Sequence, residues 1–233
     1  MVVRPEEASS YQNLIDRIGL EEVTILTIGA VGVQPTRNNI LKHADSGHMA
    51  LVDDDLKFLI RRSEKAYNLR NQTSEEIIDM FTCVDTTLST FAHVGISCRE
   101  GNNRVEEYSV LNTRCIRLVG LDLDVLNKEG IDYRLDNRED FDLTLRLLRL
   151  GYPNMVYYWW AQGQAESMAP GGMSGAPERE LDALKANAEY LAELHPGFVR
   201  VVKKKTKGAW QGQERYDVVC YWKKAFKSSE EEK

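Results

Sequence analysis

The segment His48-Met49-Ala50-Leu51-Val52-Asp53-Asp54-Asp55 decides the fold class of this chain, because a short apolar run ends in three consecutive carboxylates. A run of this length is too short for a helix and predicts a β-strand. Residues 22–28 and 56–61 also predict strands, and residues 8–18 have the spacing of a helix that ends at Gly19. The order of strand, helix and strand predicts an α/β fold with a mixed sheet flanked by helices.

The remaining segments predict one domain over residues 1–227, with a first half at 1–62 and a second half at 63–197. Apolar spacing predicts further helices at 36–44, 75–81, 140–150 and 178–195, and further strands at 91–98, 107–112 and 155–160. Two more strands, at 198–203 and 216–222, predict a C-terminal basic β-hairpin over 198–227 with its tip at 208–212. The Gly-rich residues 161–177 predict a mobile loop, and residues 228–233 predict a frayed tail.

The composition excludes several classes of protein. The 233 residues are 42% hydrophobic, which is enough for a sizeable core, and no stretch approaches the roughly 18 to 20 apolar residues of a membrane span. Without a basic-then-apolar leader, we expect a cytoplasmic protein with no membrane partner. The four cysteines lack a Cys-x-x-Cys spacing and predict buried free thiols, and the net charge of -6 argues against nucleic-acid binding by the whole surface.

The triplet Asp53 to Asp55 has two readings. Adjacent carboxylates raise one another's pKa, and a divalent cation offsets that cost most easily. Oxygen ligands favour Mg²⁺ or Mn²⁺, with a substrate diphosphate filling the remaining positions. The other reading is a solvated turn between two strands, and the triplet alone does not decide between them.

A second acidic motif, Glu139-Asp140, opens the predicted helix at 140–150. Carboxylates at that position favour the positive end of the helix dipole, which explains the pair without any catalytic role. Alternatively, one of the two removes a proton from an acceptor hydroxyl, which requires a distance of about 3 Å. Asp140 is the first choice as base and Glu139 the second.

The predicted hairpin concentrates positive charge. Lysines and aromatic residues together can neutralise phosphates and stack on bases, but alternate aromatics on a strand can equally be core with the lysines as a solvated face. The candidates for DNA binding are Lys203, Lys204, Lys205, Lys207 and Trp210.

The segment from Thr36-Arg37-Asn38-Asn39-Ile40-Leu41 to the Asp triplet resembles the nucleotide-sugar half of GT-A-type glycosyltransferases, which have a Rossmann-like fold. The resemblance implies that Asp53 and Asp55 engage a divalent cation and the donor diphosphate, with Asp54 less certain. It implies that Glu139-Asp140 lies beneath the acceptor site, with the base inverting the anomeric carbon. It further implies donor contacts from Arg4, Arg37, Asn38, Gly171 and Gly172, and a late histidine, His195, as a third metal ligand.

A longer pattern resembles the phage TET-associated glycosyltransferases, which add a sugar to 5-hydroxymethylcytosine in DNA. It consists of Asn112-x-Arg114, Gly120-Leu121-Asp122, Gly130-Ile131-Asp132-Tyr133-Arg134 and Arg138-Glu139-Asp140-Phe141-Asp142-Leu143-Thr144-Leu145-Arg146, within a similarity over 36–226. The resemblance implies a nucleotide-sugar donor such as a UDP-sugar, DNA with a hydroxymethylated pyrimidine as acceptor, and the host-cell cytoplasm as location. A polysaccharide, protein or small-molecule acceptor, and a non-catalytic DNA-binding module, remain alternatives.

Overall fold

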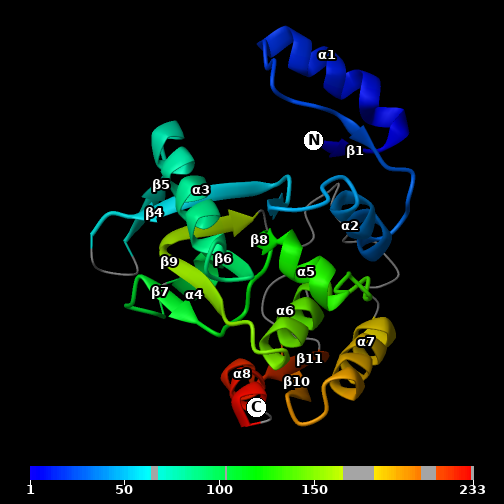
Figure 1. Cartoon of the computed structure of the whole chain (residues 1–233), viewed down its shortest axis with the longest axis vertical. Coiled ribbons are helices and arrows are strands. Elements are labelled where there is room, and N and C mark those ends of the chain that lie inside the picture. Colours follow the sequence, from blue (N-terminus) through cyan, green and yellow to red (C-terminus); the bar gives the residue numbers. More distant parts are fainter. Residues whose placement is uncertain (64–67, 103, 165–180, 206–213, 232–233) are drawn as a thin grey trace.

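A mixed sheet of seven strands forms the centre of the molecule (Figure 1). The computed structural model describes residues 1–63, 68–102, 104–164, 181–205 and 214–231. The strands lie in the order β3 (His48–Val52), β8 (Leu118–Asp122), β6 (His93–Cys98), β9 (Asn154–Gln164), β4 (Leu56–Arg61) and β5 (Leu69–Asn71), with β7 (Ser109–Leu111) also paired to β9. Only the β6–β9 pair is parallel. Consequently β3, β6 and β9 run in the same direction, and their carboxyl ends meet at one edge.

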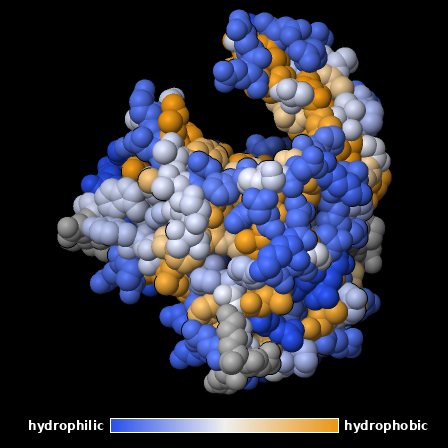
Figure 2. Space-filling model, viewed as in Figure 1, coloured by the Kyte–Doolittle hydropathy of each residue, from blue (hydrophilic) through white to orange (hydrophobic). Residues whose placement is uncertain are grey.

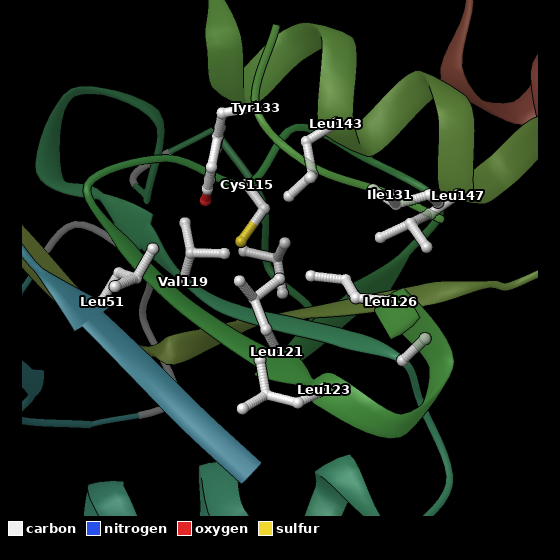
Figure 3. Packing of buried hydrophobic residues seen from close by; sticks show 12 residues of the cluster. Leu51, Cys115, Val119, Leu121, Leu123, Leu126, Ile131, Tyr133, Leu143 and Leu147 are labelled. Carbon is white, nitrogen blue, oxygen red and sulfur yellow. The ribbon is translucent and has the colours of Figure 1, made fainter. Parts of the chain in front are cut away.

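A helix covers each face of this sheet. On one face, α3 (Ser74–Leu88) packs through its apolar stripe against β6 and β8, and its start is capped by the Thr73 hydroxyl, which accepts from the Glu76 N–H. On the other face lie α5 (Leu123–Glu129) and α6 (Glu139–Arg149). Figure 3 shows this second core, in which Leu143 and Leu147 of α6 lie over Val119 and Leu121 of β8.

Two strand glycines allow these layers to approach closely. A Cβ added at Gly95 would lie 2.0 Å from Cys115 Sγ, and one at Gly120 would lie 2.9 Å from Val84 Cγ1 of α3. Both distances are shorter than real side-chain contacts permit, so the close layers require these glycines.

The N-terminal residues form a small unit of their own. β1 (Val2–Val3) pairs in parallel with β2 (Leu26–Thr27), and α1 (Ala8–Ile18) joins them and ends at Gly19, whose φ of 71° is left-handed. The predicted helix is confirmed in its bounds, but the predicted strand 22–28 is wrong in length and burial, since only Leu26–Thr27 is a strand and Thr27 is exposed. Figure 2 shows a hollow between this unit and the rest of the molecule.

The C-terminal residues form a third layer against α6. α7 (Leu181–Leu194), β10 (Val199–Lys205), β11 (Glu214–Cys220) and α8 (Trp222–Glu231) bury the side of α6 that faces away from the sheet, through Leu145 and Leu148. β10 and β11 pair antiparallel, and the residues that connect them lie outside the described part of the chain. The prediction of a frayed tail is wrong up to Glu231, because α8 continues to that residue and buries Ser229.

Several other predictions need correction. β3 is an edge strand, with Val52 43% exposed, rather than a strand buried on both faces. Residues 161–164 continue β9 instead of opening a loop, and the rest of the predicted loop lies outside the described residues. β8, α5 and α8 were not predicted, and the predicted turn after β6 is a short helix, α4 (Arg99–Asn102). No helix in the described ranges is long and apolar enough to cross a membrane.

Candidate active site

Arg37 brings the two acidic motifs to one place. It lies on α2 (Val33–Leu41), which begins earlier than predicted, and its Nη2 atom is 3.5 Å from Asp53 Oδ1 and 3.2 Å from Glu139 Oε1. Its side chain is only 14% exposed, and its guanidinium lies 5.3 Å from the centre of the Tyr133 ring. Burial would lower the pKa of Arg37, but the neighbouring acids raise it, so the guanidinium remains charged. One cation therefore joins carboxylates that come from the end of β3 and the start of α6.

Glu139 and Asp140 are held in an environment that favours their protonated forms. Burial raises the pKa of Glu139 to about 7, repulsion from Asp140 raises it further, and Arg37 opposes the shift. Burial also raises the pKa of Asp140, while Arg114 opposes it from 3.9 Å. A buried carboxyl with a pKa near neutrality is suited to proton transfer at physiological pH.

Arg114 borders the site on the side of Asp140. Its guanidinium lies 4.2 Å from the centre of the Phe141 ring, which follows Asp140 in α6. This side chain is 48% exposed, so it combines a fixed stacking position with access to solvent. It therefore supplies a positive charge where a substrate can reach it.

The Asp triplet lies where β3 ends, at the edge to which β6 and β9 also run. The Asp53 N–H donates to the Arg117 carbonyl at 3.2 Å, and Gln164 Nε2 at the end of β9 donates to Asp55 Oδ1 at 2.8 Å. Burial raises the pKa of Asp53, with Asp55 adding and Arg37 opposing. Asp54 is exposed, in line with its less certain place in the predicted site.

Two of the predicted donor contacts have other roles. Both ends of the Asn38 amide bind the backbone of Tyr133, with Nδ2 donating to the carbonyl at 2.7 Å and Oδ1 accepting from the N–H at 2.8 Å. The amide thus fixes α2 to the segment before α6, and the prediction that Asn38 binds the nucleotide is wrong in this arrangement. Arg4 is exposed in the N-terminal unit, where its backbone N–H donates to the Glu7 carboxylate.

The prediction that His195 is a metal ligand is wrong. The ring is fully buried, with Nε2 2.8 Å from Asp142 Oδ1 and Nδ1 3.3 Å from Arg149 Nη1. Because a guanidinium can only donate, Nδ1 accepts and Nε2–H donates to Asp142, which leaves no ring nitrogen for a metal. Arg134 donates two further hydrogen bonds to Asp142, so the histidine belongs to a buried network on the α7 side of α6.

The predicted lysines lie on β10, next to the acidic motif rather than far from it. Lys203 and Lys205 are exposed, whereas Lys204 Nζ donates to Asp217 Oδ2 at 2.8 Å. Arg138, the residue before α6, is 3.9 Å from Asp217 and donates to the Tyr216 carbonyl at 3.4 Å. It thereby connects β11 to the start of the acidic motif. Gly171, Gly172, Lys207 and Trp210 lie outside the described residues.

The family comparison agrees with this arrangement. The family model for TET-associated glycosyltransferases matches residues 1–172, which include both acidic motifs and Arg37. The chain belongs to the TET-associated glycosyltransferase family. It is a glycosyltransferase. A comparison with curated proteins found no match. The C-terminal layer lies beyond the matched range, so the part of the predicted similarity that extends to residue 226 has no support from the family model.

Sequence reasoning missed the role of Tyr133 and Arg117. Tyr133 stands in the pattern quoted for the family, but its place beneath the Arg37 guanidinium is a tertiary contact. Arg117 has a left-handed φ of 65° and presents its carbonyl to Asp53, and the sequence carries no signal for either feature. Arg114 was visible only as part of the Asn112-x-Arg114 pattern.

Proposed function

We propose that this glycosyltransferase moves a sugar from a nucleotide-sugar, such as a UDP-sugar, to the hydroxymethyl group of 5-hydroxymethylcytosine in DNA, with inversion and with the help of a divalent cation. The observation that carries the proposal is the bridge from Arg37 to Asp53 and Glu139. It joins the motif suited to a leaving diphosphate to the motif suited to a base.

The carboxylates after β3 fit a Mg²⁺ or Mn²⁺ ion shared with a diphosphate. Asp53 and Asp55 provide hard oxygen ligands on one turn, and repulsion from Asp55 adds to the raised pKa of Asp53. No group of three or more His, Cys, Asp or Glu side chains in the described residues forms a closed metal site. One or two carboxylates with substrate phosphates is the usual arrangement for Mg²⁺ in transferases. When bound, the cation would neutralise the charge that develops on the departing diphosphate.

Arg37 supports donor binding from the other side of the triplet. Its Nη1 atom is buried and has no hydrogen-bond partner in the described residues. A buried N–H without a partner is costly, and an anionic oxygen of the donor would satisfy it. We therefore place the diphosphate between Arg37 and the triplet in the proposal.

Asp140 is proposed as the base, with Glu139 as the second choice. As the acceptor oxygen forms its bond to the anomeric carbon, the bond from that carbon to the diphosphate breaks and its electron pair leaves with the nucleoside diphosphate. The proton of the acceptor hydroxyl passes to the carboxylate of Asp140. Attack opposite the leaving group inverts the anomeric carbon, because no covalent enzyme intermediate forms.

Mass spectrometry of hydroxymethylated DNA incubated with mixed nucleotide-sugars and Mn²⁺ tests the proposal. We expect a mass increase of one sugar with the wild type, and a loss of transfer of about 10²- to 10⁴-fold for Asp140→Asn. Unmodified-cytosine DNA is the negative control. The absence of any sugar on DNA, with transfer to another acceptor class, would refute the DNA part. Proton coupling constants that show the donor's own anomeric configuration would refute inversion.

A further inference from the structure

The largest of the three described cavities lies beside the Asp triplet. It has a volume of about 910 Å³ and lies between β4, β5, the end of β9 and α4. Gln164, which lines it, donates to Asp55 Oδ1 at 2.8 Å, so this one side chain belongs to both the cavity and the acidic site. The other two cavities are about 400 Å³ each, and neither is lined by the triplet or by Gln164.

The sheet topology places this cavity at the reactive edge. Arg99 follows β6, and Gly163 and Gln164 end β9, while the triplet follows β3. These three strands run in the same direction, so the segments after them meet where ligands bind to open α/β sheets. The cavity is thus continuous with the site in which we place the transfer reaction.

The lining combines positive charge, amides and apolar surface. Lys57 and Arg99 are exposed cations, and the carboxylate of Glu100 is offset by Arg117 at 3.9 Å. The other polar side chains are the amides of Asn71, Gln72 and Gln164, and the apolar ones are Leu56, Phe58, Leu59 and Ile77. Cations suit backbone phosphates, amides suit the edges of a base, and the apolar side chains suit its ring faces.

We infer that this cavity, which we call the β4–β9 pocket, receives one unstacked nucleotide of the DNA acceptor and directs its hydroxymethyl group toward Asp140. The inference rests on the proposed function. A volume of about 910 Å³ falls in the range of roughly 300–1,000 Å³ that encloses ligands of small-molecule size. A base pair that stays stacked in a duplex does not fit there. The acceptor base is therefore read from single-stranded DNA or after extrusion from the duplex.

Gly163 offers a direct test of the pocket. A Cβ at this position would make only ordinary contacts, 3.7 Å from Leu59 Cδ1 and 3.8 Å from Arg99 Cδ. Gly163→Ala therefore adds little volume, whereas the longer side chain of Gly163→Leu extends into the pocket. The pair separates filling of the cavity from loss of the glycine itself.

The first experiment compares transfer to a single-stranded oligonucleotide that contains 5-hydroxymethylcytosine with transfer to the same oligonucleotide annealed to its complement. The wild type is expected to use the single strand faster, because extrusion costs a few kcal/mol in a duplex. Gly163→Leu is expected to raise KM for the single strand by about tenfold or more, corresponding to the loss of one base contact. Gly163→Ala is expected to raise it much less, and KM for the donor reports that both variants are folded.

The second experiment measures binding of a labelled single strand by fluorescence anisotropy over a range of salt concentrations. Arg99→Gln is expected to reduce the slope of log K against log salt by about 0.7, the loss of one phosphate contact. Arg17→Gln, an exposed arginine of α1, is the matched control. Equal KM and equal binding for wild type and Gly163→Leu, or a faster reaction with the duplex, would overturn the inference while the proposed function stands. A wild type that binds the strand through the pocket but transfers no sugar to it would instead overturn the proposed function.

Discussion

The Arg37 guanidinium lies 3.2 Å from Glu139 Oε1, and the Arg37 and Glu139 side chains are only 14% and 13% exposed. Arg37 also contacts Asp53, so removing it leaves two carboxylates without their counter-charge. Arg37→Gln is expected to abolish detectable transfer and to lower the free energy of unfolding by about 3 kcal/mol, because an unpaired buried charge is costly. Urea denaturation and a transfer assay measure the two effects.

Arg37→Lys is the control for the same position. Lysine keeps the charge but lacks the planar fork that contacts two carboxylates at once. We expect it to recover part of the stability and little of the activity. Full activity in Arg37→Lys would show that the bridge is not needed for transfer.

The pH dependence should show opposite trends for stability and activity. The folded-state pKa of Glu139 is raised from 4.5 to about 7, so its contribution to stability is fully present below the unfolded value and is lost as the pH rises through 7. Transfer should instead rise over the same range as the Glu139–Asp140 pair ionises. Thermal melting and initial rates between pH 5 and pH 8 measure the trends in wild type and Glu139→Gln.

Glu139→Gln provides the decisive comparison, because it cannot ionise at this position. The decrease in its stability between pH 5 and pH 8 should be smaller than that of the wild type. An identical decrease in both proteins would contradict the assignment of the raised pKa to Glu139.

His195 is expected to stabilise the fold without contributing to metal use. His195→Leu removes the donor to the buried carboxylate of Asp142 and should lower the free energy of unfolding by about 2 kcal/mol. The Mn²⁺ concentration that gives half-maximal transfer should not change, whereas Asp53→Asn should raise it. A large increase for His195→Leu at unchanged stability would return this residue to the metal site.

The lysines of β10 should differ in their contribution to DNA binding. Lys203 and Lys205 are exposed, while Lys204 is already paired with Asp217 at 2.8 Å. The double change Lys203→Gln and Lys205→Gln should therefore reduce the salt dependence of duplex binding by up to about 1.8, or about 0.9 for each phosphate contact. Lys204→Gln is the matched control and should have a smaller effect. Equal effects of all three lysines would contradict this distinction.

Short-range patterns were sufficient for much of the local structure. The bounds of α1, β3 and β4 follow directly from apolar spacing, and Gly19 ends α1 as its conformational freedom predicts. α6 was predicted from its leucines, although it is buried on two sides, because a helix between two layers keeps the same spacing. β8 escaped prediction because Gly120 interrupts its apolar pattern, a residue that only the closeness of α3 explains.

The sequence by itself determined the α/β class, the family resemblance and the two acidic motifs, since these depend on residue order and local spacing. Only the tertiary structure decided which charged groups meet. It paired Arg37 with Asp53 and Glu139, directed the Asn38 amide to the backbone of Tyr133, and buried His195 against Asp142. The physical reason is that electrostatic and hydrogen-bonding contacts act over a few ångströms in space, and distant segments reach that range only when the layers pack.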